Sequence, residues 1–249
     1  MKIETKTRKK FRKELIIFED LLFNGEELCN NFQFLITHYS INNEFGTLHF
    51  HLARNLRLIK SSYELSIRGN YTEAFIIIRS IMESSLLSRY FALNPNAIKE
   101  YHNYQMKIEQ EQNIEIKKKL LGKLSNIYGP GAIRRKIAGL NDKLDDDFYR
   151  VYNSLSSYVH PPILREGEFL QGSSNSYLIT LKHVFHEGLF IEWFRAASLS
   201  LATSLKIFEI LYHKSFFKHL GKPFLLKLKK MAEQIIYLIE VRADINTDT

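Results

Sequence analysis

The sequence is poor in cysteine, proline and glycine. Cys29 is the only cysteine, so no disulfide can form within the chain, and a scaffold held together by disulfides is excluded. Five prolines and eleven glycines in 249 residues are too few for a low-complexity protein. The same scarcity favours long helices. The unpaired thiol suits the reducing cytosol, so we expect a cytoplasmic protein.

Long apolar runs are also missing. The least polar stretch, residues 196–205, is ten residues long and contains three serines and one threonine, about half of what a bilayer span needs. The basic start of the chain is followed by Glu14, Glu19 and Asp20, which interrupt the apolar segment that a secretion signal requires. We therefore expect no membrane-spanning segment and no membrane partner.

The sequence patterns of several enzyme and cofactor sites are absent. There is no glycine-rich phosphate loop, no GxSxG serine motif and no recognisable cysteine triad. His183, His186 and Glu187 are expected close together on one helix, but they do not complete a metal site. The rings of His49 and His51 are expected to point apart along a helix, so they form no chelate. We therefore expect neither a metal ion nor another cofactor.

Positive charge is concentrated at one end of the chain. The formal net charge is +8, and residues 1–13 contribute seven cations against Glu4. We interpret this segment as a basic arm on a nearly neutral fold, with Lys9, Lys10 and Arg12 as candidate contacts to RNA or another anionic surface. The alternative is an arm that only keeps the protein soluble.

Apolar residues recur every three or four positions along almost the whole chain, which predicts amphipathic helices. No segment shows the alternation of a strand, and no repeat of fixed period indicates a solenoid. We expect one all-α domain over 14–243, a helical bundle with long antiparallel helices, followed by a frayed tail at 244–249. The later helices are expected at 70–93 with Asn70 as N-cap, 95–121, 132–139, 145–159, 176–213 and 222–242.

Two opposite charges interrupt the most apolar helix. Segment 74–91 is apolar almost all round, which predicts a buried central helix. Arg79 and Glu83, one turn apart, fall within its apolar face. A buried charge without a partner is costly, so the two groups must pair with each other, with another helix or with a ligand. The alternatives are a salt bridge that fixes packing and a functional site.

A polar strip borders the apolar face of helix 145–159. Tyr149, Asn153, Ser156 and His160 lie within about 60° of one another on a helical wheel. His160 ends the helix just before two prolines, where the helix dipole favours imidazolium. A histidine in this position can act as a general acid or base, or contact a phosphate. The alternative is a capping histidine with no further function.

Two motifs in these helices resemble a known family. Residues 68–83 read RGNYTEAFIIIRSIME, and residues 147–161 read DFYRVYNSLSSYVHP. In order and spacing they resemble domain-of-unknown-function family 5677, over roughly residues 45–210. The positions that match its pattern are Arg79, Glu83, Tyr152, Ser156 and His160.

That family is similar in pattern to the HEPN superfamily of small helical bundles. The resemblance implies an HEPN-like fold, a homodimer, and a role in RNA cleavage, phage defence or a toxin–antitoxin pair. In active HEPN nucleases an arginine precedes the histidine, separated from it by four to six residues. Here the corresponding positions are Asn153, Ser154 and Leu155, so the motif is broken. Arg79 or a residue of a second copy would have to supply the missing cation.

Two hypotheses follow. In the first, the protein is a metal-independent ribonuclease of defence or toxin type, with His160 as acid and base. Ser156 and Tyr152 then orient this histidine or the phosphate, and Arg79 stabilises the developing charge. In the second, these residues and Glu83 form a buried network in a non-catalytic module that dimerises or binds a small anionic ligand. The nuclease needs the histidine open to a groove, whereas the network needs it closed.

The resemblance also implies a partner protein, either an antitoxin or another defence protein.

Overall fold

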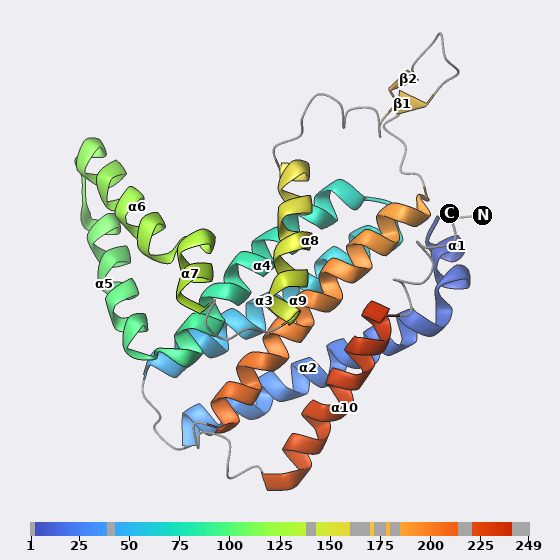
Figure 1. The fold of residues 1–249 in the computed structure, drawn as a ribbon, viewed down its shortest axis with the longest axis horizontal. Coiled ribbons are helices and arrows are strands. Elements are labelled where there is room, and N and C mark those ends of the chain that lie inside the picture. Colours follow the sequence, from blue (N-terminus) through green and yellow to red (C-terminus); the bar gives the residue numbers. More distant parts are fainter. Residues whose placement is uncertain are drawn as a thin grey trace.

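The computed structural model of the protein describes residues 3–38, 43–137, 143–159, 170–171, 178–179, 185–213 and 221–240. The helices in these residues are α1 (Ile3–Lys10), α2 (Arg12–His38), α3 (Asn43–Ile67), α4 (Tyr71–Leu93), α5 (Asn96–Gln110), α6 (Ile114–Tyr128), α7 (Pro130–Ile137), α8 (Lys143–Val159), α9 (Glu187–His213) and α10 (Gly221–Glu240). Two strands of two residues, β1 (Leu170–Gln171) and β2 (Leu178–Ile179), pair antiparallel. Apart from this pair, the described residues confirm the prediction of an all-α protein (Figure 1).

Three helices, α3, α4 and α9, form the centre of the molecule. α4 lies between α3 and α9, α8 crosses over α4 and α9, and α2 and α10 lie side by side beneath them (Figure 1). The prediction that 74–91 is a central buried helix is confirmed, since Phe75, Ile78, Ile81 and Met82 of α4 are all inaccessible to solvent. Full burial of such a side chain stabilises the fold by about 1.5–3 kcal/mol.

The only tryptophan of the chain joins these three helices. Trp193 of α9 is fully buried, and its indole Nε1 donates a hydrogen bond to Ser62 Oγ of α3 at 2.6 Å. Ser62 in turn donates to the carbonyl oxygen of Ala74 in α4 at 3.0 Å. Because these polar groups satisfy one another, their burial carries little desolvation penalty.

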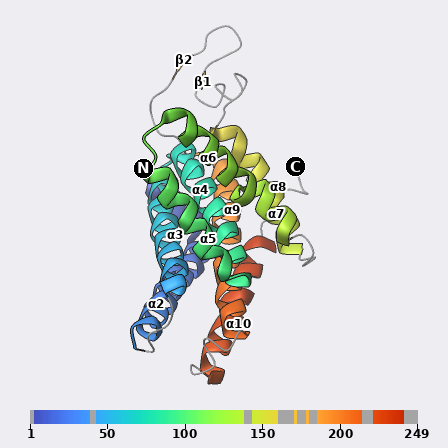
Figure 2. The ribbon, with the colours of Figure 1, turned by 90° about the vertical axis from the view of Figure 1, so that its left-hand side faces the viewer.

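α5 and α6 form a helical hairpin that projects from one end of the bundle, and Figure 2 shows it from the front. The prediction of a single helix over 95–121 is therefore wrong. The chain turns at 111–113, where the Asn113 side chain accepts hydrogen bonds from the backbone N–H groups of Glu115 and Ile116, at 2.9 and 3.3 Å. Asparagine is among the best N-cap residues, and this one starts a second helix.

The turn before α4 has Asn70 at the N-cap, as predicted, but the capping does not involve its side chain. The carbonyl of Asn70 accepts a hydrogen bond from the backbone N–H of Ala74, as an N-cap should, but its side chain makes no capping bond. Gly69 directly before it has a φ of 87°. Glycine adopts this left-handed conformation without strain, and it commonly ends a helix in this way. The turn therefore depends on Gly69 more than on the Asn70 side chain.

α9 begins at Glu187 rather than at 176, and β2 lies within the range that was predicted as helix. The start of α9 is marked by His186, whose ring Nδ1 accepts a hydrogen bond from the backbone N–H of Leu189 at 3.2 Å. His186 is thus a capping residue. The expected frayed tail at 244–249 lies outside the described residues.

The N-terminal segment is not a separate arm, which corrects the expectation for residues 1–13 as far as they are described. Thr7 of α1 is fully buried, and its hydroxyl lies 3.4 Å from the carbonyl oxygen of Ile67 in α3. Phe11 is 1% exposed and stacks on Phe190 of α9, with ring centroids 4.6 Å apart. This apolar side chain holds the segment on the bundle despite its many charges.

Candidate functional site

Three of the predicted site residues meet where α8 crosses α4. The hydroxyl of Tyr152 on α8 donates a hydrogen bond to Glu83 Oε1 at 2.9 Å and lies 3.5 Å from the donor Arg79 Nη2. Arg79 and Glu83 of α4 are themselves 3.6 Å apart. The tyrosine hydroxyl therefore bridges the two charges that sequence analysis found within an apolar face, and they have a partner on another helix.

The surroundings of this cluster keep the hydroxyl of Tyr152 protonated. The Arg79 side chain is only 17% exposed and its guanidinium lies 5.4 Å from the centre of the Tyr152 ring. Burial raises the pKa of Tyr152, and the hydrogen bond to Glu83 raises it further against the opposing effect of Arg79. The hydroxyl is consequently protonated at neutral pH and acts as a hydrogen-bond donor.

The other predicted residues of α8 do not join this cluster directly. The hydroxyl of Ser156 donates to the carbonyl oxygen of Tyr152 at 3.1 Å, one turn earlier in its own helix. Asn153 is exposed. Tyr149 is 6% exposed, and its ring centre lies 6.5 Å from that of Tyr152. His160 lies outside the described residues.

The short helix α7 adds three cations that sequence analysis did not select. Its apolar side packs on α4 and buries Ala132, Ile133 and Ile137. Three consecutive side chains are left on the surface: Arg134, Arg135 and Lys136. We call these three residues the α7 basic surface.

Tyrosine rings hold two of these cations. The guanidinium of Arg134 lies 3.9 Å from the ring centre of Tyr149, close enough for a cation–π contact. A series of side-chain contacts thus runs from α7 across α8 to α4, through Arg134, Tyr149, Tyr152 and Arg79. The predicted cluster and the α7 basic surface are therefore neighbouring parts of one site.

Lys136 is held on the other side of α7. Its ammonium donates to the carbonyl oxygen of Ile127 at 2.9 Å and lies 4.9 and 5.1 Å from the ring centres of Tyr90 and Tyr128. Arg135 lies between the two anchored cations in sequence, and its side chain is exposed. The sequence did contain a signal for the α7 basic surface, namely a local excess of positive charge. Residues 114–137 carry seven cations and one carboxylate.

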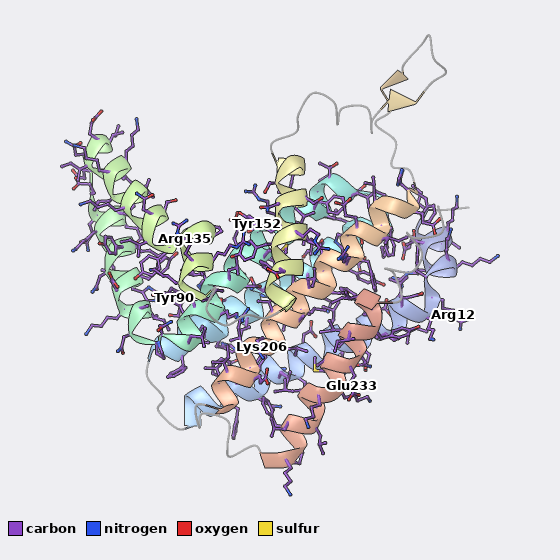
Figure 3. All side chains as sticks on the ribbon, viewed as in Figure 1. Arg12, Tyr90, Arg135, Tyr152, Lys206 and Glu233 are labelled. Atoms are coloured by element: carbon purple, nitrogen blue, oxygen red, sulfur yellow. The ribbon has the colours of Figure 1, made fainter. Side chains whose placement is uncertain are left out.

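The predicted N-terminal cations lie elsewhere. Lys10 forms an ion pair with Glu187 of α9, whereas Lys9 and Arg12 are exposed. Figure 3 shows Arg12 and Arg135 on opposite sides of the central helices. The chain therefore presents two separate basic regions, and the N-terminal cations do not extend the site around α7.

A second polar contact joins α3 to α4 next to Glu83. His51 Nδ1 lies 3.2 Å from Ser84 Oγ, and burial lowers the pKa of His51 to about 4, with Arg54 and His102 contributing. His51 is thus neutral at pH 7. His49 instead packs its ring edge to face against Phe32 of α2, so the two histidines contact different helices.

No group of three potential metal ligands is found among the described residues. None of the described helices combines the length and the apolar character required to cross a membrane. The fold and the site thus define an all-α protein with a basic surface anchored on tyrosine rings.

No model of a protein family matches the chain, and neither a curated protein nor a solved structure matches it. The likeness to family 5677 and to HEPN proteins is therefore a prediction from the sequence motifs alone.

Proposed function

We propose that this protein is an HEPN-like helical protein that binds single-stranded RNA through its phosphates at the α7 basic surface. The main support is the group of three exposed cations spread around α7, of which Arg134 and Lys136 are held on tyrosine rings on its two sides. Cations that are spread over a helix surface suit a chain of phosphates better than a single small anion, and they give binding without sequence preference.

The tyrosine rings prepare these cations for binding. A guanidinium that lies over a ring keeps N–H donors at its edge, where they can reach a phosphate. Fixing a long side chain before the ligand arrives also reduces the entropy lost on binding. Tyr149 positions Arg134 in this way, and Tyr152 supports Tyr149 from the next turn of α8.

The contacts of Arg79 favour a positioning role over catalysis. Its guanidinium lies within reach of Glu83 and Tyr152, and the side chain is mostly buried. The cluster therefore fixes α8, whose Tyr149 contacts Arg134 of the α7 basic surface, in agreement with the hypothesis of a structural network. An antitoxin or defence partner also belongs to this proposal, and it rests on the sequence resemblance.

The test measures binding of a labelled single-stranded RNA by fluorescence anisotropy at several salt concentrations. The double variant Arg134→Ala, Arg135→Ala should bind more weakly, and the slope of log K against log salt should flatten by about 0.7 for each lost phosphate contact. The control is Lys229→Ala, Lys230→Ala, which removes two adjacent exposed cations from α10. Equal loss in both double variants, or none in the first, contradicts the proposal.

Cleavage of the bound RNA is a second candidate function. It is favoured by the order of Tyr152 and Ser156 on α8, which ends at Val159 directly before His160. The RNA from the same mixtures, kept with a chelator, is therefore also examined on a denaturing gel with wild type and His160→Ala. Shortening by the wild type alone supports acid–base catalysis by His160, and intact RNA with both argues for binding alone.

A further inference from the structure

The projecting helix α6 has two different faces. One face lies against α5 and contains the half-buried residues Leu120, Leu124 and Ile127. The other is a stripe on the surface, with the helical spacing of four, three, one and three residues. We call it the outer face of α6, and it consists of Ile114, Lys118, Leu121, Gly122 and Ser125.

The outer face exposes apolar side chains that a solvent-facing helix does not need. Ile114 is 69% exposed and Leu121 is 48% exposed, two turns apart on the same stripe. Exposed aliphatic residues that line up in this way are typical of a surface that another protein covers.

Gly122 in the middle of α6 is a second, independent observation. A glycine inside a helix costs about 0.5–1 kcal/mol relative to alanine. Its φ is not positive, and a β-carbon at this position would have no atom of the described residues outside its own helix within 4 Å. Nothing in the described chain explains the glycine, whereas a second helix that approaches closely at this point would explain it.

The charges of the hairpin indicate what that second helix is. The tip, residues 109–115, carries Glu109, Glu111 and Glu115 and no cation, whereas residues 117–123 carry four lysines and no carboxylate. The carboxylates of the tip repel RNA and anionic lipid, so neither is a suitable partner for the hairpin. Two hairpins in antiparallel orientation, however, place the acidic tip of each copy against the lysines of the other.

We propose that two copies of this chain pair through the outer faces of α6, in antiparallel orientation about a two-fold axis. Helical spacing then brings Ile114 of one copy to Leu121 of the other, and Glu115 of one copy to Lys119 of the other. Each contact occurs twice, because the two faces are identical. In this register Gly122 of one copy lies opposite Asn113 of the other, where the absent side chain leaves room for the start of the partner's α6.

The first test compares apolar substitutions by sedimentation velocity over about a hundredfold range of protein concentration. The wild type should form dimers as its concentration rises. Leu121→Asp should raise the dissociation constant of the dimer at least about tenfold. Leu226→Asp is the matched control, since Leu226 on α10 is 65% exposed and lies outside the proposed interface. A wild type that stays monomeric, or equal weakening by both variants, overturns the proposal.

The second test uses charge. Glu115→Lys alone and Lys119→Glu alone place like charges against each other in a dimer, so each variant should be monomeric. An equimolar mixture of the two variants pairs lysines with glutamates in both contacts and should dimerise again. Both side chains are exposed, and circular dichroism checks that the variants are folded. A mixture that remains monomeric excludes the antiparallel arrangement.

Discussion

At the scale of residues, Tyr152 is the point at which α8 is fixed to α4. Arg79 Nη2 and Glu83 Oε1 are 3.6 Å apart, and the Glu83 side chain is 42% exposed. This ion pair alone therefore contributes little to stability. The tyrosine hydroxyl gives Glu83 a shorter bond of 2.9 Å from another helix. A local pair within one helix thereby becomes a tertiary contact.

Tyr152→Phe is expected to destabilise the protein by about 1–2 kcal/mol, because it removes a hydrogen bond to a charged group in a partly buried position. Ser156→Ala on the same helix is the control. Among the described residues its hydroxyl bonds only to the carbonyl of Tyr152, and alanine is the better helix former, so stability should change by less than about 0.5 kcal/mol. Urea unfolding measures both variants, and equal effects would contradict the bridging role.

His51 predicts a dependence of stability on pH. Its pKa is lowered from 6.5 to about 4 in the fold, mainly by burial. Between these pH values the unfolded chain binds the proton more readily, so the free energy of unfolding falls as the pH falls from about 6.5 to about 4, by at most about 1.4 kcal/mol per pH unit. Urea unfolding of His51→Gln across this range should show a smaller slope than the wild type. An unchanged slope would assign the effect to other groups.

At the scale of elements, the helices with strong apolar periodicity were predictable. The pattern of 74–91 identifies α4, and it is central and buried as predicted. The boundary between α5 and α6 was missed, because residues 109–113 contain neither an apolar residue that would show the period nor a glycine or proline that would mark a turn. Asn113 was the local signal, since its side chain offers the new helix an N-cap.

In the site as well, the features that depend on neighbouring residues in one helix were predictable, and the contacts between helices were not. The placement of Arg79 and Glu83 in an apolar face correctly required a partner. That this partner is Tyr152 depends on how α8 crosses α4, which the spacing within either helix does not determine. Arg134 was overlooked because the excess of positive charge was assigned to the N-terminus, although residues 114–137 carry as large an excess.

At the scale of the whole molecule, the two basic regions lie on opposite sides of the central helices (Figure 3). The N-terminal region is at the same time part of the core, because Thr7 and Phe11 are buried. Charge and stability are therefore coupled in this segment: a truncation that removes its cations also removes core side chains.

Deletion of residues 2–13 should consequently destabilise the protein. Loss of a buried phenylalanine such as Phe11 alone costs about 3–5 kcal/mol, a large part of the total stability of a typical domain. Lys9→Ala, Arg12→Ala is the matched control, since both side chains are exposed and Phe11 remains. Urea unfolding followed by circular dichroism should show a large loss for the deletion and little change for the control. A deletion variant of wild-type stability would show that α1 is dispensable for the fold.

Trp193, whose indole donates a hydrogen bond to Ser62, also provides an intrinsic fluorescence signal for unfolding of the core. The indole is the only one in the chain and is enclosed by the three central helices, with the rings of Phe18 and Tyr63 beside it. Its fluorescence should therefore shift to longer wavelength only when α3, α4 and α9 separate. Denaturation of the core can then be recorded on the unlabelled protein, independently of events on the surface of α6 or α7.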